Sequence, residues 1–363
     1  MQKRYEKLMR RCLALAEKGA GHVSPNPLTG AVIFDDDFNV ISEGYHAQYG
    51  ADHAERSAIL NAQADLKGKS LIVNLEPCSH WGKTPPCADL IIEKGIKRVI
   101  FGMIDPNPIV SGKGAAKLKA AGIEVIEGVL EDKCRKLNEI FIKNQTKNLP
   151  FIMIKTACTL DGKTASRTGS SKWITDEYSR AAVHKLRNRY DAVLTGSGTV
   201  IKDNPLMTCR IKNGRNPARI VLDTNLKTSP ESRIYNNDGA KVIIIAGENA
   251  PDKKINQYGG NVKIIKCPLK NEHIDLKRAA ALLYKEGISS IMIEAGAAVN
   301  NSFIQEGLAD KLIQFTAPKI LSDKEGRGFS EGCIRENISE CSNLKIDAVK
   351  KLKNDIMIIG YFL

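Results

Sequence analysis

The sequence alternates short apolar runs with amphipathic segments on both sides of a polar stretch, KNQTKNLP at residues 143–150. Apolar runs of about four to eight residues bounded by turn signals are typical of buried strands, and the segments between them have the periodicity of helices. This alternation favours layered α/β domains. Because the polar stretch ends in proline, it is the best candidate for a linker, and we place a domain boundary near residue 148.

The first part, residues 1–148, predicts an α/β sandwich of about five strands. The strands expected there are Gly30–Phe34, Val40–Gly44, Ser70–Leu75, Val99–Met103 and Glu124–Gly128. The helices expected there are Tyr5–Lys18, His53–Gln63, Ala88–Lys94 and Gly114–Ala121.

The second part, residues 149–363, predicts a larger α/β domain. The strands expected there are Phe151–Ala157, Ala192–Thr195, Arg219–Leu222, Val242–Ala246, Ile264–Lys266, Ser290–Glu294 and Lys311–Thr316. The helices expected there are Asp176–Arg189, Leu276–Glu286 and Val299–Glu306.

The chain is basic, with 54 Lys and Arg against 41 Asp and Glu, a formal net charge of +13. Most of the excess belongs to the second part, where 33 basic residues face 23 acidic ones, against 21 and 18 in the first. A positive balance favours an anionic ligand, which includes nucleic acid, a phosphorylated metabolite and a dinucleotide. The hydrophobic content of 42% excludes wholesale disorder.

The N-terminal segment is basic but lacks the apolar stretch of a signal peptide, so we expect an amphipathic helix there. The longest apolar runs, such as Val242–Ala246, are far shorter than the 18 or so residues of a membrane helix. Nine cysteines form an odd set, which favours reduced thiols, metal ligands or a nucleophile. We therefore expect a cytoplasmic protein that does not span a membrane.

Three candidate zinc ligands lie at the ends of predicted elements. His53 opens a helix, Cys78 follows a strand, and Cys87 begins another helix. One imidazole and two thiolates leave the fourth position of a tetrahedral zinc ion open, as in catalytic sites, whereas structural sites usually have four protein ligands. Glu55, two residues from His53, is placed to move a proton without being a ligand. Zinc that activates water and a carboxylate that carries a proton to a leaving amine are what hydrolytic deamination requires.

This H-x-E and P-C pattern is that of zinc-dependent nucleobase deaminases, but eight residues separate Cys78 from Cys87 where C-x-x-C is usual. Two other classes stay open on this ground. One is a deaminase that acts on nucleic acid, such as a tRNA-editing enzyme, which leaves the last 215 or so residues unexplained. The other is a non-catalytic zinc protein that binds nucleic acid, although no aromatic-rich stacking surface is visible.

Several segments resemble the deaminase half of the bifunctional deaminase/reductase family of riboflavin biosynthesis. These segments are Pro25–Pro27, His53–Glu55, Glu76–Cys87, Asp105–Pro108 and Ser111–Gly114. The resemblance implies a three-layer α/β/α domain of the cytidine-deaminase type. It implies one zinc ion per chain on His53, Cys78 and Cys87, with Glu55 as the acid/base group.

The same resemblance implies the substrate contacts of this domain. Asn26 would lie against the pyrimidine, and the long insert between the cysteines would meet the phosphoribosyl part through His80, Lys83 and Thr84. We interpret Asp105–Pro108 as a loop that leaves a strand and assign it no catalytic role.

In the second part, two strand-to-helix turns offer small residues to an anion, Gly196–Thr199 and Glu294–Ser302. Glycine lets backbone N–H groups approach a phosphate, and a helix N-terminus favours negative charge. The two turns together favour a dinucleotide site, although the first lacks the third glycine of the usual fingerprint. Arg187 and Arg210 are suited to bidentate pairs with a substrate phosphate. Trp173, judged alone, is equally well explained by core packing.

Four segments of this part resemble the reductase half of the same family: Lys155–Ala165, Ser171–Thr175, Asp191–Val200 and Asp203–Arg210. The resemblance implies a dihydrofolate-reductase-like α/β domain that uses NADPH, with Lys155, Asp203 and Glu294 nearest the reacting ribose carbon. The residues that it implies for the cofactor are Ala157, Trp173, Thr199, Asp203, Thr224, Gly296, Ala297, Ala298, Val299, Asn300, Asn301 and Ser302. Those that it implies for the substrate are Ser171, Arg187, Met207, Arg210 and Glu294.

The resemblance covers nearly the whole chain and implies two consecutive reactions. The first domain would remove the 2-amino group of 2,5-diamino-6-ribosylamino-4(3H)-pyrimidinone 5′-phosphate. The second would use NADPH to reduce the ribosyl chain, giving 5-amino-6-ribitylamino-uracil 5′-phosphate. The expected partner is thus a phosphorylated pyrimidine, with no nucleic acid and no membrane, and the family suggests a homo-oligomer, either a dimer or a tetramer.

Overall fold

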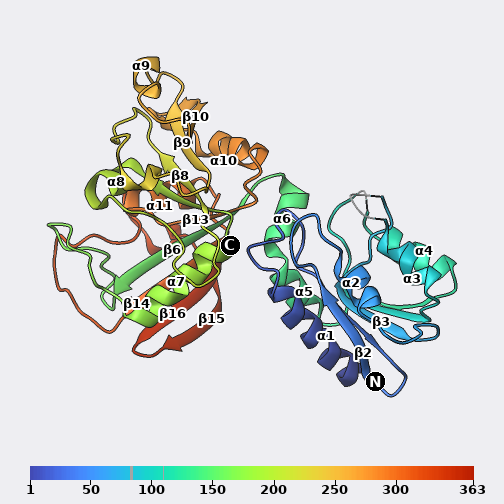
Figure 1. Ribbon diagram of the computed structural model, residues 1–363. Coiled ribbons are helices and arrows are strands. Elements are labelled where there is room, and N and C mark those ends of the chain that lie inside the picture. The colour runs from blue at the N-terminus through green and yellow to red at the C-terminus, as the bar shows by residue number, and fades with distance from the viewer. Residues whose placement is uncertain (82–84, 109) are drawn as a thin grey trace. The chain divides into compact units, whose positions relative to one another are not determined.

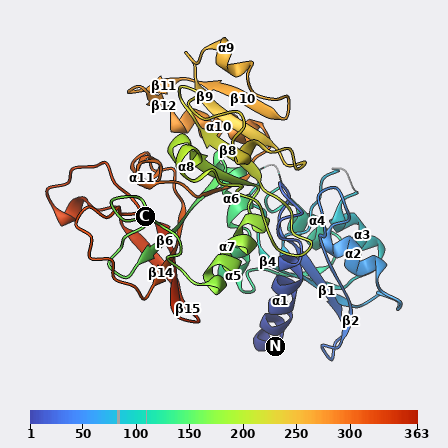
Figure 2. The same ribbon diagram turned by 60° about the vertical axis from the view of Figure 1, so that its left-hand side comes forward.

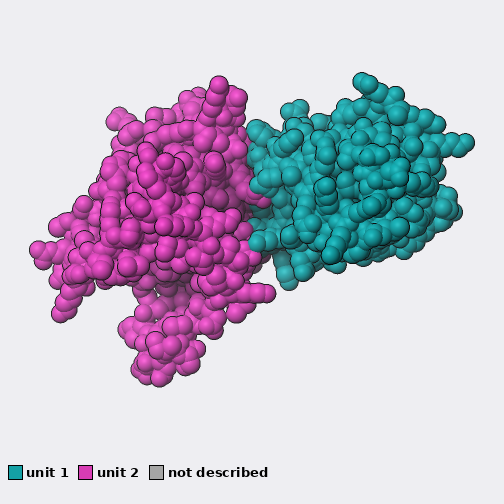
Figure 3. Space-filling model, turned by 90° about the horizontal axis from the view of Figure 1, so that it is seen from below, with its two compact units in different colours: residues 1–148 teal, residues 149–363 magenta. Residues whose placement is uncertain are grey.

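The structure is a computed structural model that describes residues 1–81, 85–108 and 110–363. The chain divides into two compact units, Met1–Asn148 and Leu149–Leu363 (Figure 3). Each unit has its own main sheet. Within the described residues, no helix combines the length and the apolar character that crossing a bilayer requires.

The first unit contains a five-stranded sheet of order β2-β1-β3-β4-β5. Strand β1 runs antiparallel to β2 and β3, whereas β3, β4 and β5 are parallel. The strands are β1 (Gly30–Phe34), β2 (Val40–Tyr45), β3 (Ser70–Leu75), β4 (Arg98–Met103) and β5 (Glu124–Ile126). The helices are α1 (Gln2–Glu17), α2 (Ala54–Leu60), α3 (Cys87–Glu93), α4 (Lys113–Ala120), α5 (Glu131–Leu137) and α6 (Glu139–Lys147).

Alternating side chains of the buried strands form the two faces of this sheet. Val32 and Ile72 belong to a core with residues of α1 and α5. Ile33 and Val73 belong to the opposite core, with residues of α2, α3 and α4. Figures 1 and 2 show α1 on one side of the sheet and α2, α3 and α4 on the other. The first unit is therefore a three-layer α/β/α sandwich, because both faces of its strands are apolar.

The C-terminal end of the first unit differs from what the sequence predicts. Residues 143–147, predicted to belong to a linker, form the last part of α6, and the chain leaves the helix at Asn148 in a left-handed conformation (φ 54°). Asparagine tolerates this conformation better than most residues. Helices α5 and α6 were not predicted, and β5 ends at Ile126 rather than Gly128. Polar residues on a short exposed helix give little of the apolar periodicity on which such predictions depend.

The second unit contains a nine-stranded sheet of order β10-β9-β8-β7-β13-β6-β14-β16-β15 and a small β11-β12 pair. Its strands are β6 (Phe151–Thr159), β7 (Ala192–Gly196), β8 (Ala218–Leu222), β9 (Val242–Gly247), β10 (Val262–Cys267), β11 (Leu269–Lys270), β12 (His273–Ile274), β13 (Ser290–Ile293), β14 (Lys311–Ala317), β15 (Leu344–Leu352) and β16 (Asp355–Phe362). Its α-helices are α7 (Glu177–Arg189), α8 (Ser197–Asp203), α9 (Asp252–Ile255), α10 (Leu276–Lys285) and α11 (Ala297–Gln305), with short 3₁₀ helices at Arg233–Tyr235 and Ile338–Glu340.

Strands β6 to β10, β13 and β14 run parallel to one another, and the hairpin of β16 and β15 is added to the sheet with β16 antiparallel to β14. The hairpin was not predicted. Its register shifts between Ile346 and Ala348, and such a bulge breaks the two-residue alternation that identifies a strand in a sequence. The carboxyl ends of β6, β7, β8 and β13 share one edge of the sheet, where α/β folds bind ligands.

Candidate active sites

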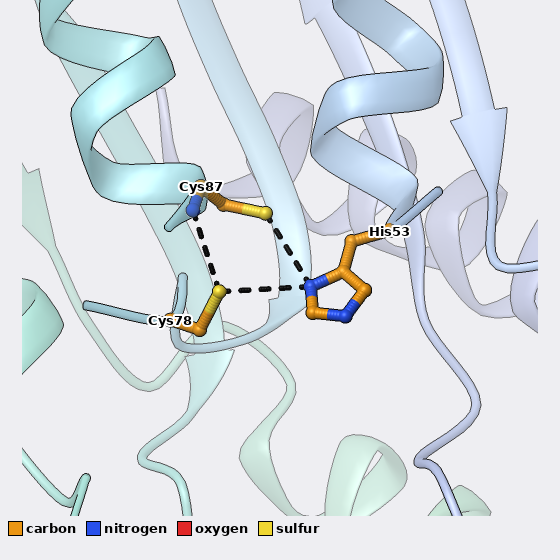
Figure 4. Close-up of side chains that lie close together, drawn as sticks. All are labelled: His53, Cys78 and Cys87. Atoms are coloured by element: carbon orange, nitrogen blue, oxygen red, sulfur yellow. Dashed lines mark hydrogen bonds between the residues drawn. The ribbon is translucent and has the colours of Figure 1, made fainter. Parts of the chain in front are cut away.

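His53, Cys78 and Cys87 come together in the first unit, where their ligand atoms lie within 4.8 Å of one another (Figure 4). His53 immediately precedes α2, Cys78 follows β3, and Cys87 is the first residue of α3. The His53 Nδ1 atom lies 3.6 Å from Cys78 Sγ and 3.5 Å from Cys87 Sγ. The start of α2, the end of β3 and the start of α3 thus bring together three donor side chains that are far apart in the sequence.

The donor distances fit a zinc ion. Bonds of about 2.0–2.1 Å to nitrogen and about 2.3 Å to sulfur that meet at a tetrahedral angle place the two atoms about 3.5–3.6 Å apart. The backbone N–H of Cys87 also donates to Cys78 Sγ over 3.3 Å. Hydrogen bonding by the side chain of Cys87 lowers the pKa of the Cys78 thiol to about 4. The site therefore favours the thiolate form of Cys78, whereas the same hydrogen bond and burial raise the pKa of the Cys87 thiol.

Glu76 fixes the loop that carries Cys78. Its carboxylate accepts hydrogen bonds from the backbone N–H groups of Asp105, Gly112 and Ala115, at 3.0–3.1 Å. A Cβ at Gly114 would overlap the Pro77 carbonyl, so only glycine fits there. These contacts join the ends of β3 and β4 into one rigid rim.

Glu55 is buried in the first turn of α2 and lines a cavity of about 300 Å³ that His53 and Cys78 also line. Burial and then the neighbouring Cys78 raise the pKa of Glu55 to about 7. A bound divalent cation opposes that rise, because its charge favours the carboxylate. Glu55 thus lies beside the three donors without being one of them.

The cavity also contains residues predicted to meet the substrate and others that were missed. Asn26 and His80 line it, whereas Lys83 and Thr84 lie outside the described residues. Other residues that line it were not predicted: His46, Tyr49, Asp105, Asn107, Phe141 and Gln145. Asp105 and Asn107 belong to the loop that we had interpreted as having no catalytic role. Phe141 and Gln145 come from α6, which the sequence did not predict.

Two asparagines hold the segment that contains Asn26. Asn138 accepts a hydrogen bond from Leu28 N–H at 2.8 Å and donates one to the Leu28 carbonyl at 3.0 Å. Asn74 donates to the same carbonyl at 2.8 Å and accepts from Gly30 N–H at 2.8 Å. The cavity wall on this side is therefore fixed by buried side chains that no sequence motif marks.

In the second unit, Lys155, Arg187 and Glu294 form a buried cluster. Strands β6 and β13 are paired so that Ile154 lies opposite Ile293, which places the next residues, Lys155 and Glu294, side by side. Lys155 Nζ donates to Glu294 over 3.1 Å. Arg187, on α7, donates to both carboxylate oxygens of Glu294 over 2.6 and 3.0 Å.

The two cations determine the charge of Glu294. Burial alone would raise the pKa of this carboxyl, but Lys155 and Arg187 outweigh it and lower the pKa to about 2. Arg187 also donates to the Thr208 carbonyl over 3.0 Å and contacts the Met207 sulfur at 3.9 Å. The guanidinium N–H groups of Arg187 are thus already bonded to protein groups, whereas the sequence suggested a pair with a substrate phosphate.

The strand-to-helix turns lie at the same sheet edge. Gly196 precedes α8 and Gly296 precedes α11, after the neighbouring strands β7 and β13. A Cβ at Gly196 would crowd Val299 of α11, whereas one at Gly198 or Gly296 would meet nothing within 4 Å. The turns therefore pack closely on each other and leave open space in front, which fits an approaching phosphate.

The other predicted residues of this unit lie on several elements and loops. Ala157 lies on β6, Thr199 on α8 and Thr224 two residues after the end of β8. Asp203, the last residue of α8, and Arg210 are exposed, and Ser171 is half-buried. Trp173 is not a core residue, because 67% of it is exposed, its ring lies 4.6 Å from the Arg180 guanidinium, and its carbonyl accepts from Lys319 Nζ.

Comparison with known proteins identifies the protein family that each unit resembles. Residues 2–103 match the cytidine and deoxycytidylate deaminase zinc-binding region, and residues 150–358 match the RibD C-terminal domain. The riboflavin biosynthesis protein RibD of Aquifex aeolicus (strain VF5) is 41% identical over 361 residues, which cover 99% of this chain and 98% of that protein. The chain belongs to the RibD family.

Other RibD proteins agree over the same length. The protein of Escherichia coli (strain K12) is 35% identical, with 97% of each chain covered. A crystal structure of a diaminohydroxyphosphoribosylaminopyrimidine deaminase/5-amino-6-(5-phosphoribosylamino)uracil reductase from Thermotoga maritima matches with a TM-score of 0.90, 42% identity, and coverage of 100% of this chain and 99% of that one. Acinetobacter baumannii RibD matches with a TM-score of 0.89, 33% identity and full coverage of both chains.

The RibD matches confirm the fold class and the function expected from the sequence. The fold class is a cytidine-deaminase-like domain followed by a RibD reductase domain. The chain is a bifunctional enzyme of riboflavin biosynthesis, with a zinc-binding deaminase domain and a reductase domain. The reductase domain accounts for the residues that a nucleic-acid deaminase would leave unexplained.

Proposed function

We propose that the first unit hydrolyses the 2-amino group of 2,5-diamino-6-ribosylamino-4(3H)-pyrimidinone 5′-phosphate. The observation that carries this proposal is the grouping of His53, Cys78 and Cys87 at zinc-binding distances in the cavity that Glu55 lines. These three residues would hold one zinc ion per chain. Zinc, when bound there, supplies the activation of water for attack on the ring carbon.

Glu55 moves the proton in this reaction. Its carboxylate takes a proton from the attacking water and passes it to the amino group that leaves as ammonia. Because burial favours its protonated form, Glu55 takes the proton from the attacking water more readily than an exposed carboxylate would and holds it until the amine leaves. Asn26 and His80, which line the same cavity, contact the pyrimidine and the phosphoribosyl part. Lys83 and Thr84, which lie outside the described residues, are proposed from the family resemblance to meet the phosphoribosyl part as well.

We propose that the second unit then reduces the ribosyl chain to the ribityl chain, giving 5-amino-6-ribitylamino-uracil 5′-phosphate. NADPH, when bound, supplies the hydride for this step. Glu294 aligns Lys155 through their 3.1 Å ion pair, so that the ammonium can donate to the oxygen on the reacting sugar carbon. Asp203 is proposed as a further polar group near that carbon.

The cofactor would bind at the shared edge of β6, β7, β8 and β13. Gly296 and the first turn of α11 (297–302) receive the pyrophosphate, and Thr199 and Thr224 lie at neighbouring strand ends. Ala157, on β6, and the exposed Trp173 contact the nicotinamide half. Ser171, Met207 and Arg210 would meet the sugar phosphate, with Arg187 acting mainly through Glu294.

We also propose a cytoplasmic homo-oligomer, a dimer or tetramer, that acts on small molecules and not on nucleic acid. All nine cysteines are free thiols, which supports a reducing compartment.

The purified protein tests both activities at once when it is given the diaminopyrimidine phosphate with and without NADPH. We expect ammonia in both mixtures, and loss of NADPH absorbance only after ammonia has begun to appear. Ammonia release that requires NADPH, or NADPH oxidation without ammonia, would contradict the proposed order.

A further inference from the structure

His46 is a buried residue of the deaminase cavity to which neither the zinc site nor the proton transfer assigns a role. It follows directly after β2, is only 1% exposed, and lines the cavity together with Asn26. Its ring makes an edge contact with the His53 ring, with centroids 5.6 Å apart. Its two nitrogens have different partners, the Asp52 carbonyl at 2.9 Å and Asn26 Nδ2 at 3.1 Å.

These two partners are compatible with a single arrangement of hydrogens. A backbone carbonyl can only accept, so Nδ1 of His46 carries a hydrogen and donates it to Asp52. In the neutral ring Nε2 then has a lone pair, and the amide nitrogen of Asn26 donates to it. The hydrogen-bond network thus assigns both the tautomer of His46 and the direction of the Asn26 amide.

Other hydrogen bonds already hold the backbone around Asn26, so only the orientation of its side-chain amide depends on His46. The backbone N–H of Asn26 donates to the Val23 carbonyl over 2.8 Å, and Asn138 and Asn74 hold the peptide of Leu28. The terminal torsion of asparagine is broad and nearly two-fold, so a fixed backbone does not decide which end of the amide faces a ligand. His46 decides it, because its Nε2 accepts from the nitrogen end.

We propose that His46 is a positioning residue of the deaminase site: it holds Nδ2 of Asn26 so that Oδ1 is the group presented to the pyrimidine. The cavity then offers an acceptor to a ring N–H or amino group and disfavours a ring that has an acceptor at that place. This inference rests on the proposed deamination in the first unit. His46 acts through Asn26 and takes no part in proton transfer.

Two substitutions distinguish the hydrogen bond of His46 to Asp52 from its hydrogen bond to Asn26. Asn at position 46 can reproduce the Nδ1 donor to Asp52 but is too short to reach Asn26. Gln at position 46 can place its side-chain oxygen where Nε2 lies and accept from Asn26. We expect His46→Asn to raise the deaminase KM about ten-fold with little change in kcat, and His46→Gln to keep KM within about two-fold of the wild type.

The decisive comparison is a double-mutant cycle of His46→Asn and Asn26→Ala. The deaminase KM of each variant is measured from ammonia release in the absence of NADPH. His46→Asn should add nothing to the KM of Asn26→Ala, because both remove the same oriented amide. Each protein should keep about one zinc per chain and its NADPH oxidation with the deaminated substrate. Additive effects on KM, equal defects in the Asn and Gln variants, or loss of zinc from His46→Asn would each overturn the positioning role. A wild-type protein that releases no ammonia would instead overturn the proposed function, and this inference with it.

Discussion

Arg187 donates two hydrogen bonds, of 2.6 and 3.0 Å, to the carboxylate of Glu294, so its guanidinium is held by a buried side chain before any substrate arrives. Lys155 reaches the same carboxylate from β6. One acidic group thus balances two cations at the sheet edge where the reductase site is proposed. Removing its charge leaves both cations close together with no compensating group.

We therefore predict that Glu294→Gln destabilises the second unit by about 3–5 kcal/mol, as is usual when one partner of a buried ion pair is removed. Chemical denaturation followed by circular dichroism measures this. The matched control is Glu286→Gln, whose partner Lys263 is largely exposed, and it should cost less than about 1 kcal/mol. Equal effects of the two substitutions would show that the cluster does not stabilise the fold.

Lowering the pH gives a second test of how much the pairing of Glu294 with Lys155 and Arg187 stabilises the fold. Glu294 titrates near pH 2 in the folded protein and near 4.5 in the unfolded chain, so its lowered pKa contributes stability that is complete above about pH 5. That contribution, about 3 kcal/mol, is lost as the pH falls towards 2. The stability difference between the wild type and Glu294→Gln should therefore shrink from pH 6 to pH 3. A difference that stays constant over this range would exclude a lowered pKa at Glu294.

Zinc content tests the metal site. Cys87→Ser should lose most of the zinc and the ammonia release, because a hydroxyl is a much poorer zinc ligand than a thiolate. NADPH oxidation with the deaminated substrate should persist, since Cys87 belongs to the first unit. The control is Cys333→Ser, which alters an exposed thiol of the second unit. Elemental analysis that finds equal zinc in both variants would contradict the assigned ligands.

Asn138→Ala removes two hydrogen bonds to the half-buried Leu28 peptide, two residues beyond Asn26. We expect it to destabilise the first unit by about 1–3 kcal/mol, because the Leu28 N–H loses its partner and the Leu28 carbonyl keeps only the hydrogen bond from Asn74. It should also raise the deaminase KM without affecting NADPH oxidation. Thermal unfolding and steady-state kinetics measure the two effects, and an unchanged KM would mean that this segment does not shape the cavity.

The grouping of the three candidate zinc ligands could be predicted because each of them lies at the end of an element with a clear apolar pattern. His53 precedes a helix, Cys78 follows a buried strand and Cys87 starts a helix. The parallel strands of the second sheet were predictable for the same reason, since they are buried on both faces.

Contacts between residues far apart in the sequence could not be predicted. Asn138 bonds a peptide 110 positions away, and Arg187 meets Glu294 across 107 positions. A single histidine after a strand, such as His46, carries no motif. The register that places Lys155 beside Glu294 depends on how β6 and β13 pair, which local patterns do not fix.

The central claim is that one chain contains two separate active sites, and two variants test it in the same assay. Glu55→Gln should keep its zinc, lose ammonia release by at least about 100-fold, and still oxidise NADPH when given the deaminated pyrimidine. Lys155→Ala should release ammonia at the wild-type rate and lose NADPH oxidation by about 100-fold or more. If either substitution abolished both activities, or if Glu55→Gln deaminated at the wild-type rate, the account would be wrong.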